Sequence, residues 1–432
     1  MSIPAPEADF AAVLAARRAR VAGALELTDE ILLAGAGEPV PLPEGTDQTY
    51  PFLAHTEYYY LAALECPGSV VAFDPKDGPE AGWKSFVPDV TEAERVWEAR
   101  VQPPGEPVAA LEPWLTARRG RTIIGLGAPL RGVRADEART AAVRERFAAA
   151  RRPKDDAELA LLRLAADATA AGHAAMAERL RPGVTERALQ IEMEAAFYRA
   201  GADGTGYGTI VGAGPNSAVL HFSPSGRTVS DGDFVLVDAG AHVGRYVIDV
   251  TRTHLVGDVS PFQRDLYQIV LAAEEAAIAR CVPGAEWKDI HLAAAVEMMA
   301  GLVEVGIMRG EAESLVEQAA HTLFFPHGLG HLVGLGVRDA SGRAVGRAPD
   351  GRTSLKNLRM DLPLQPGYVT TVEPGLYFIP AILNDPARRE KYRDAVHWDR
   401  VEECMDLGGV RIEDNVLVTE GAPEVLTSAV PK

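Results

Sequence analysis

The N-terminal part of the chain alternates helical hydrophobic patterns with short apolar runs. Helical patterns occur near 8–22 and 135–150, and apolar runs of strand length occur at 68–73 and 122–126. Helices that alternate with short apolar runs are typical of an α/β domain. A basic segment that contains a proline follows at 150–156 and predicts a domain boundary.

The rest of the chain predicts longer helices with strands between and after them. Ser260-Pro-Phe-Gln263 has the form of a capping box with proline at the first helical position. Helices are expected over 158–180, 185–201, 260–281 and 287–305. Strands of a largely antiparallel sheet are expected over 233–238, 246–254, 368–372 and 409–418. We therefore expect two domains, one over residues 1–151 and one over residues 152–432.

Charge and composition exclude several classes of partner. The formal net charge of the 432 residues is −18, and no lysine and arginine run is long enough to attract a polyanion. Nucleic acid and anionic membrane surfaces are therefore not expected as partners. No apolar run approaches the roughly 18 residues that span a bilayer.

Cysteine usage and the N-terminal pattern predict a cytoplasmic protein. Cys66, Cys281 and Cys404 lie far apart and form no pair with metal-binding spacing. Such an odd, sparse set is typical of a reducing compartment without disulfides. Near the N-terminus the basic cluster follows the apolar run, which is the reverse of a secretory signal.

Acidic residues inside the expected strands are the first sign of chemistry. Asp238 ends the apolar run 234–238, and Asp249 interrupts the run 246–251. The segment between them is rich in turn residues, so the two runs can fold back as a hairpin with both carboxylates on one face. Buried carboxylates are unfavourable unless they are paired or bind a metal. For this pair alone, two aspartates satisfied by the protein remain an open alternative.

Three later segments add further candidate ligands. His327 and His331 lie four apart among glycines, so this is not a helical zinc motif, and in an extended chain the two rings can share a face. Glu373 ends a β-branched run, and Glu413 lies inside another strand pattern. Two Asp, two Glu and one His form an oxygen-rich set, which favours Mn²⁺ or another divalent ion over a structural zinc. Shared carboxylates can bridge two such ions about 3.5–4 Å apart.

These positions, in this order and with an eleven-residue step between the aspartates, resemble the pita-bread metallopeptidases. The resemblance is to their proline-directed branch, aminopeptidase P and prolidase, and covers residues 152–432. A weaker match lies around 58–61 and 66–68. The resemblance implies an α/β (α+β) fold in which an N-terminal α/β domain precedes a pita-bread domain. That second domain has a curved, mainly antiparallel sheet flanked by helices.

The resemblance also implies the roles of the five candidate ligands. Asp238 would bind one metal and His331 the other, while Asp249 and Glu413 would bridge both. Glu373 would bind a metal and also act as the acid/base for a metal-bridging water that attacks the peptide carbonyl. Manganese is expected, with cobalt or zinc as alternatives.

Further residues match positions near the scissile bond in this family. His221 matches a family histidine near the scissile bond, and His327 matches one placed to hydrogen-bond the tetrahedral intermediate. Arg411 is expected to orient the carboxylates because it lies two residues before a ligand. Tyr207 and Arg359 match positions that line the substrate pocket. For Arg359 a solvated surface role is an equal alternative.

One departure from the family pattern concerns substrate binding. Gly336 and Arg338 stand where the family usually has an aspartate and a histidine in a Gly-Leu-Asp-Val-His-Asp run. Arginine stays protonated, so it cannot inherit the proton chemistry of a histidine, but its planar fork suits a carboxylate. We expect Arg338 to bind the C-terminal carboxylate of a dipeptide. An internal salt bridge, for example to Asp339, is the alternative.

The prediction for function is therefore an Xaa-Pro dipeptidase that takes short proline-containing peptides and forms a homodimer, as the resemblance implies. An Xaa-Pro aminopeptidase that acts on longer peptides is the closest alternative. A creatinase-like C–N hydrolase and a non-catalytic pita-bread interaction protein are more distant alternatives. Relatives of both kinds lack metal ligands, whereas all five positions are filled here.

Overall fold

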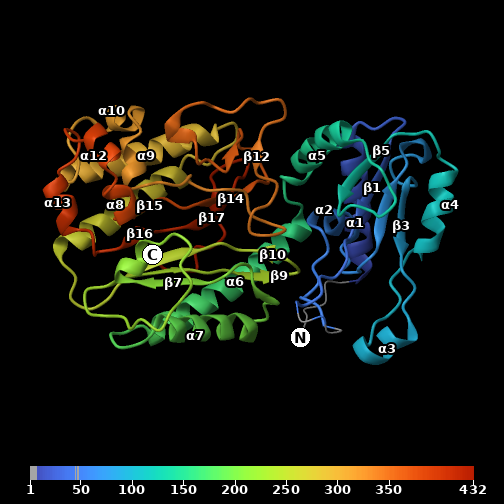
Figure 1. Ribbon diagram of the computed structural model, residues 1–432, viewed down its shortest axis with the longest axis horizontal. Helices are drawn as coiled ribbons and strands as arrows, with labels where there is room; N and C mark the ends of the chain where they lie inside the picture. Colours follow the sequence, from blue (N-terminus) through green and yellow to red (C-terminus); the bar gives the residue numbers. More distant parts are fainter. Residues whose placement is uncertain (1–6, 44, 46–47) are drawn as a thin grey trace. The chain divides into compact units, whose positions relative to one another are not determined.

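The computed structural model describes residues 7–43, 45 and 48–432 (Figure 1). Residues 1–6, at the start of the predicted N-terminal domain, lie outside the described residues. The chain divides into two compact units, with the boundary between Arg151 and Arg152. No helix in the described part of the chain combines the length and apolar character that crossing a membrane requires.

The N-terminal unit contains a five-stranded mixed sheet in the order β4-β3-β2-β1-β5. Strand β1, which lies between β2 and β5, pairs antiparallel with β2 and parallel with β5. Residues two apart on the strands, such as Ile31 and Leu33, share a face and enter one buried apolar cluster. The strands are β1 (Ile31–Gly35), β2 (Val70–Phe73), β3 (Trp83–Val87), β4 (Glu106–Pro107) and β5 (Ile123–Gly127). The helices are α1 (Glu7–Leu25), α2 (Thr56–Ala62), α3 (Glu92–Glu98), α4 (Leu111–Thr116) and α5 (Glu137–Arg151).

The C-terminal unit carries its strands in several small sheets. One has the order β11-β8-β7, another β14-β17-β18, and β15 pairs with β16. Two further sheets have the orders β10-β9-β6 and β12-β13. The strands that come first are β6 (Gly204–Thr205), β7 (Ile210–Ala213), β8 (Phe234–Asp238), β9 (Ala241–Val243), β10 (Tyr246–Val247) and β11 (Thr251–Leu255). The later strands are β12 (Gly342–Arg343), β13 (Met360–Asp361), β14 (Val369–Val372), β15 (Gly375–Tyr377), β16 (Gly409–Arg411), β17 (Asp414–Leu417) and β18 (Glu424–Val425).

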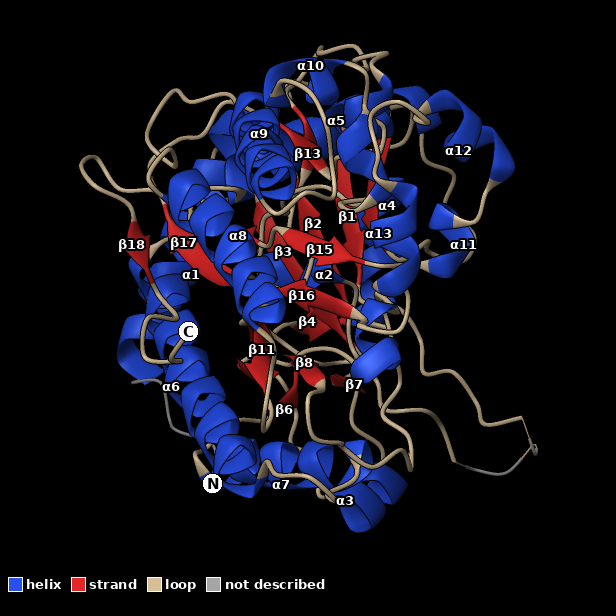
Figure 2. Ribbon diagram, turned by 90° about the vertical axis from the view of Figure 1, so that its left-hand side faces the viewer, coloured by secondary structure: helices blue, strands red, loops and turns tan. Residues whose placement is uncertain are grey.

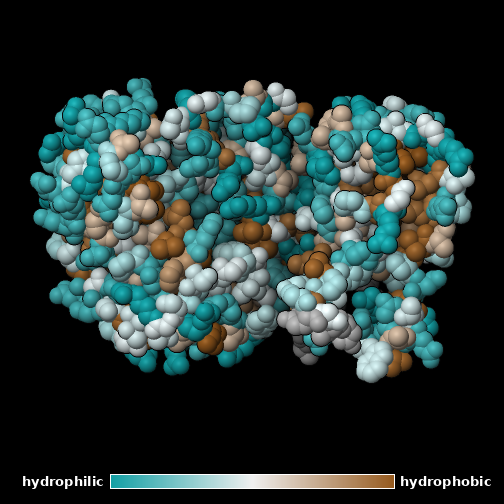
Figure 3. Space-filling view, in the orientation of Figure 1, coloured by the Kyte–Doolittle hydropathy of each residue, from teal (hydrophilic) through white to brown (hydrophobic). Residues whose placement is uncertain are grey.

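Helices cover both sides of these strands. The helices α8 and α9 pack on the side of β13 to β16, and α6 and α7 pack on the side of β7, β9 and β10 (Figure 1). In Figure 2, α8 and α9 lie above the strands β7, β8 and β11 of this unit, and α7 lies below them. The helices are α6 (Asp156–Arg179), α7 (Glu186–Arg199), α8 (Pro261–Ile278), α9 (Trp287–Glu304), α10 (Ala312–Glu317), α11 (Pro380–Leu383), α12 (Pro386–Lys391) and α13 (Trp398–Glu403). Hydrophilic residues cover most of the face of this unit that Figure 3 shows, with smaller apolar areas between them.

Local sequence explains where the main helices begin. At α8 the Ser260 hydroxyl accepts a hydrogen bond from the Gln263 N–H, and the Gln263 side chain accepts one from the Ser260 N–H, which confirms the capping box. The Thr185 hydroxyl caps α7 in the same way by accepting from the Ala188 N–H. Apolar side chains of α8 and α9, among them Leu266 and Met298, then pack into the largest buried cluster of the unit.

The mixed α/β architecture that the sequence predicts is confirmed, but the strands differ in detail. The expected strand 246–254 is divided into β10 and β11, and the expected strand 409–418 is divided into β16 and β17. The run that ends in Asp238 pairs with β11 rather than with β10, because β9 lies between them in the chain and pairs with β10. Asp249 and Glu413 lie in the two breaks.

Candidate metal centre and active site

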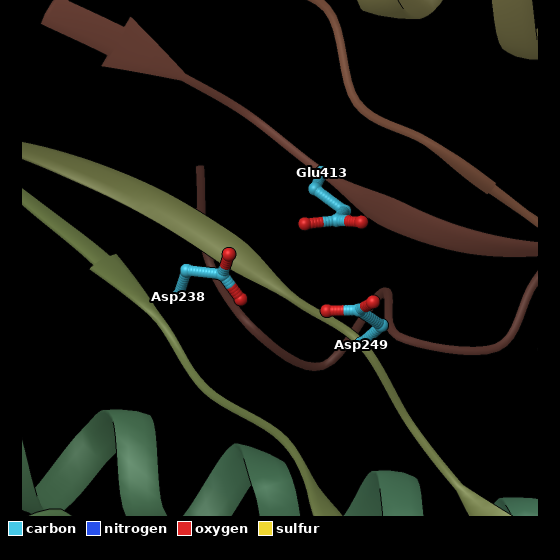
Figure 4. Close-up of side chains that lie close together, drawn as sticks. All are labelled: Asp238, Asp249 and Glu413. Atoms are coloured by element: carbon cyan, nitrogen blue, oxygen red, sulfur yellow. The ribbon is translucent and has the colours of Figure 1, made fainter. Parts of the chain in front are cut away.

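Three carboxylates from separate segments meet inside the C-terminal unit. Asp238 is the last residue of β8, while Asp249 and Glu413 lie in the breaks after β10 and β16. One carboxylate oxygen from each lies within 4.8 Å of the others, and all three residues are buried. Figure 4 shows the three carboxylates pointing toward one another.

Hydrogen bonds to residues distant in the chain satisfy the backbone at the two strand breaks. The Asn415 side chain accepts from the Asp249 N–H at 3.0 Å and donates to the Asp249 carbonyl at 2.5 Å. The Glu413 N–H donates to the Thr251 carbonyl at 3.0 Å. The backbone polar groups at these positions are therefore satisfied without a continuous strand, and both side chains are free to turn into the cluster.

His331 and Glu373 extend the cluster. His331 Nε2 lies 3.5 Å from Asp249 Oδ2 and 3.8 Å from Glu373 Oε1. His331 Nδ1 faces the Leu332 carbonyl at 3.1 Å, so this nitrogen carries the proton and Nε2 presents its lone pair to the acids. Burial lowers the pKa of His331 to about 4, so the ring is neutral at physiological pH. A neutral imidazole oriented in this way is suited to metal ligation.

The protein compensates the charge of the clustered acids only in part. Burial raises the pKa of Asp249 well above its usual range, and the charges of Asp238 and Glu373 raise it further. Burial, followed by Asp249 and Glu373, does the same for the pKa of Glu413. Burial also raises the pKa of Glu373 to about 7. Ionised carboxylates this close repel one another, so the donor set fits divalent cations that prefer oxygen ligands.

Arg411 links the cluster to a chain of hydroxyl groups. Its guanidinium donates to Asp238 Oδ2 at 2.7 Å, to Tyr377 Oη at 2.8 Å and to Thr251 Oγ1 at 3.1 Å. The Thr251 hydroxyl donates to Glu413 Oε2 at 2.6 Å. One arginine thus fixes the orientation of two of the predicted ligands, one directly and one through threonine.

Thr251 and Tyr377 are functional residues that were not predicted from the sequence. Hydroxyl groups are common, and neither residue stands out by type. The available signal was their position, because Thr251 lies two residues after Asp249 and Tyr377 lies four residues after Glu373. Side chains two apart along an extended chain share a face.

A cavity of about 430 Å³ opens onto the cluster. Its lining includes all five predicted ligands together with His221, Tyr207 and Arg338. Tyr207 Oη donates to Asp238 Oδ1 at 2.7 Å. Arg359 is not part of this lining; it is exposed and lines a separate hollow with Arg343 and Lys356.

His327 lies beside the cavity with both ring nitrogens engaged by the protein. Nδ1 faces the Gly328 carbonyl at 2.9 Å, and Nε2 faces the Tyr377 hydroxyl at 2.9 Å. The hydroxyl accepts from Arg411, so its own proton points to Nε2. The expected hydrogen bond from His327 to the tetrahedral intermediate stays a prediction, and it requires the ring to exchange one of these partners.

Comparisons with known proteins point in the same direction as this geometry. The chain matches the model of metallopeptidase family M24 over residues 160–420. It is 33% identical to an Xaa-Pro dipeptidase of Xanthomonas campestris, with 93% of this chain and 94% of that protein covered. It is 30% identical to a probable Xaa-Pro aminopeptidase of Paracoccidioides lutzii, with 91% and 88% covered.

Solved structures of similar fold cover the whole chain. The aminopeptidase PepP of Pseudomonas aeruginosa is 27% identical with a TM-score of 0.79, and 100% of this chain and 96% of that chain are covered. Aminopeptidase P of E. coli, solved with the inhibitor Pro-Leu, is 26% identical with a TM-score of 0.76, with 100% and 97% covered.

Proposed function

We propose that this chain, which belongs to metallopeptidase family M24, is an Xaa-Pro dipeptidase that hydrolyses the bond before proline in dipeptides and short peptides. The observation that carries the proposal is the buried cluster of Asp238, Asp249 and Glu413, with His331 and Glu373 beside it on one cavity. An Xaa-Pro aminopeptidase acting on longer peptides is the second candidate, since relatives of both kinds match the chain over most of its length.

Two divalent ions would be held by five residues: Asp238, Asp249, His331, Glu373 and Glu413. Four of the five donors are carboxylates, so manganese is the proposed ion, with cobalt or zinc as alternatives. When bound, such ions polarise the peptide carbonyl and lower the pKa of water. They also offset the repulsion between the carboxylates, and this requires that the carboxylates be deprotonated.

Glu373 is proposed as the acid/base of the reaction. Its side chain is 18% exposed, so it can be reached from the cavity, whereas Asp249 is 8% exposed. It would take the proton from the attacking water and pass it to the leaving proline nitrogen. The Thr371 hydroxyl lies 3.4 Å from Glu373 Oε1 and helps to orient the carboxylate.

The surrounding residues would hold the site and the substrate. Arg411 and Tyr207 both donate to Asp238, one to each oxygen, and so fix its orientation. His221 lines the cavity and is proposed to hydrogen-bond the reacting carbonyl. Because the site is pre-organised in this way, little reorganisation is needed when substrate binds.

The test is hydrolysis after exhaustive chelation and re-addition of single metals. The chelated protein should release no proline from Ala-Pro, and Mn²⁺ should restore the release. A dipeptidase should cleave Ala-Pro in preference to Ala-Pro-Ala, while the opposite preference would favour the aminopeptidase. Full activity in a demonstrably metal-free sample would refute the metal-dependent mechanism.

A homodimer in the cytoplasm is proposed on the family resemblance. Light scattering at micromolar concentration should give about twice the mass of one chain, which is 46.1 kDa. A monomer under these conditions would contradict the proposed assembly without affecting the proposed chemistry.

A further inference from the structure

The lining of the cavity at the acid cluster carries several acidic side chains and an arginine. Four of its lining residues are carboxylates, and among the lining residues that the structure describes Arg338 is the one permanent cation. Arg338 lines this cavity together with Glu373 and His331. Arg338 is exposed, which leaves its planar fork accessible to a ligand.

Arg338 has no protein partner in the described part of the chain, whereas its acidic neighbour does. Asp339 Oδ2 lies 3.0 Å from Lys154 Nζ, and both side chains are at most 1% exposed. The same Asp339 oxygen accepts from the Leu335 N–H at 3.1 Å. The salt bridge between Arg338 and Asp339 that the sequence left open is therefore not formed, because Asp339 is buried and already paired.

The loop that presents Arg338 is fixed at several points. The Asp339 N–H donates to the Leu332 carbonyl at 3.0 Å, and the Gly336 N–H donates to the Arg245 carbonyl at 3.1 Å. Gly336 has φ of +97°, a backbone conformation that residues with a side chain rarely adopt. The guanidinium thus projects from an ordered backbone, which reduces the entropy lost when it binds a ligand.

We propose that Arg338 binds the free carboxylate of the proline residue and so makes the cavity selective for dipeptides. This inference rests on the function proposed above. Arginine and a carboxylate form paired charge-assisted hydrogen bonds about 2.7–2.9 Å long. Each further residue moves the terminal carboxylate by about 3.3–3.6 Å, which breaks those bonds.

The size of the cavity agrees with this choice of substrate. Its volume of about 430 Å³ is near the lower end of the roughly 300–1,000 Å³ of small-molecule sites. A dipeptide fits such a volume, whereas the additional residues of a longer peptide must extend out of the cavity.

The experiment compares Ala-Pro with Ala-Pro amide, in which a neutral terminal group that also donates hydrogen bonds replaces the carboxylate. Wild type, Arg338→Gln, Arg338→Lys and the control Arg343→Gln are assayed with Mn²⁺. Arg343 is also exposed but lines the separate hollow, so its removal changes the net charge equally. Arg338→Gln should raise KM for Ala-Pro by about 10- to 100-fold and leave the amide unchanged. Arg338→Lys should retain part of the effect, because lysine keeps the charge without the fork.

A binding measurement separates recognition from turnover. In a Glu373→Gln background, calorimetry with Ala-Pro and its amide should show the same loss for Arg338→Gln on the acid alone. Equal losses on both ligands, or the same loss in Arg343→Gln, would overturn the role of Arg338. If wild type cleaves neither peptide with Mn²⁺, the proposed function fails. If it cleaves both but Arg338→Gln matches wild type, this inference alone fails.

Discussion

Asp74 in the N-terminal unit and the acid cluster in the C-terminal unit place carboxylates in similarly buried surroundings with opposite results. Asp74 is 3% exposed and lies within 2.7 Å of nitrogens of both Arg118 and Arg121. Hydrogen bonds from Arg121 hold the pKa of Asp74 well below its usual range. Asp249 and Glu413 are buried to a similar degree, yet their pKa values are raised.

Burial raises the pKa of both cluster acids, and the positive charge that the protein supplies to Asp74 accounts for much of the difference. Two arginines of the protein pair with Asp74 and neutralise its charge, so this carboxylate needs no external cation. In the cluster a single guanidinium, that of Arg411, reaches Asp238, and the other acids face one another. A buried set of acids that the protein does not neutralise is a stability cost unless an external cation binds.

The largest expected effect is the loss of kcat when Glu373, the proposed acid/base, is replaced. Glu373→Gln should lower kcat on Ala-Pro by more than the about 10²–10⁴-fold typical of general acid–base catalysis, because a metal ligand is lost as well. The side chains are nearly isosteric, so the fold should persist, as circular dichroism would check. A folded variant that binds metal and keeps the wild-type kcat would show that Glu373 is not the acid/base.

Removing the Asp74 carboxylate should destabilise the protein equally with and without bound metal. Asp74→Asn leaves two arginines without their acceptor and should lower the free energy of unfolding by about 2–4 kcal/mol. Asp77→Asn is the matched control, because Asp77 pairs with Arg118 at 3.0 Å but is 47% exposed. That exposed pair should contribute less than about 1 kcal/mol.

The sign of the pH dependence follows from the lowered pKa of Asp74. Its stabilising contribution is present above the ordinary range near pH 4 and is lost as the pH falls toward the folded-state value. The difference between wild type and Asp74→Asn should therefore be constant around pH 7 and shrink in acid. A difference that grows in acid would contradict this assignment.

The smallest effect has the opposite sign. In metal-free protein, Asp249→Asn removes the cost of burying an acid beside other acids and should raise the free energy of unfolding by about 1–2 kcal/mol. Wild type should gain about 2.7 kcal/mol from Mn²⁺ at a hundred times its Kd, and the variant should gain much less. Thermal denaturation with and without chelator measures both, with exposed Asp258→Asn as control. A destabilised metal-free variant would mean that the protein already satisfies Asp249.

Most helices and strands could be predicted, because the sequence signals for them are local. The Ser260 capping box and the Thr185 cap mark helix starts within a few residues, and apolar alternation marks the strands. The breaks at Asp249 and Glu413 could not be predicted. One depends on the Asn415 side chain, 166 positions away in the chain, which takes the place of a strand partner. The network through Tyr377 likewise depends on long-range contacts that residue type does not reveal.

The buried pair of Lys154 and Asp339 has a consequence for how this protein can diversify. A side chain at Gly334 would collide with Lys154 Cε and Asp339 Oδ2, so these three positions constrain one another. Arg338 lies outside that constraint, with its side chain exposed and unpaired in the described structure. Saturation libraries at 338 should therefore yield folded variants with altered substrate ranges, whereas libraries at 334 or 339 should mostly lose the fold. Substrate specificity can therefore also change in evolution through substitutions at position 338 while Lys154, Gly334 and Asp339 stay unchanged.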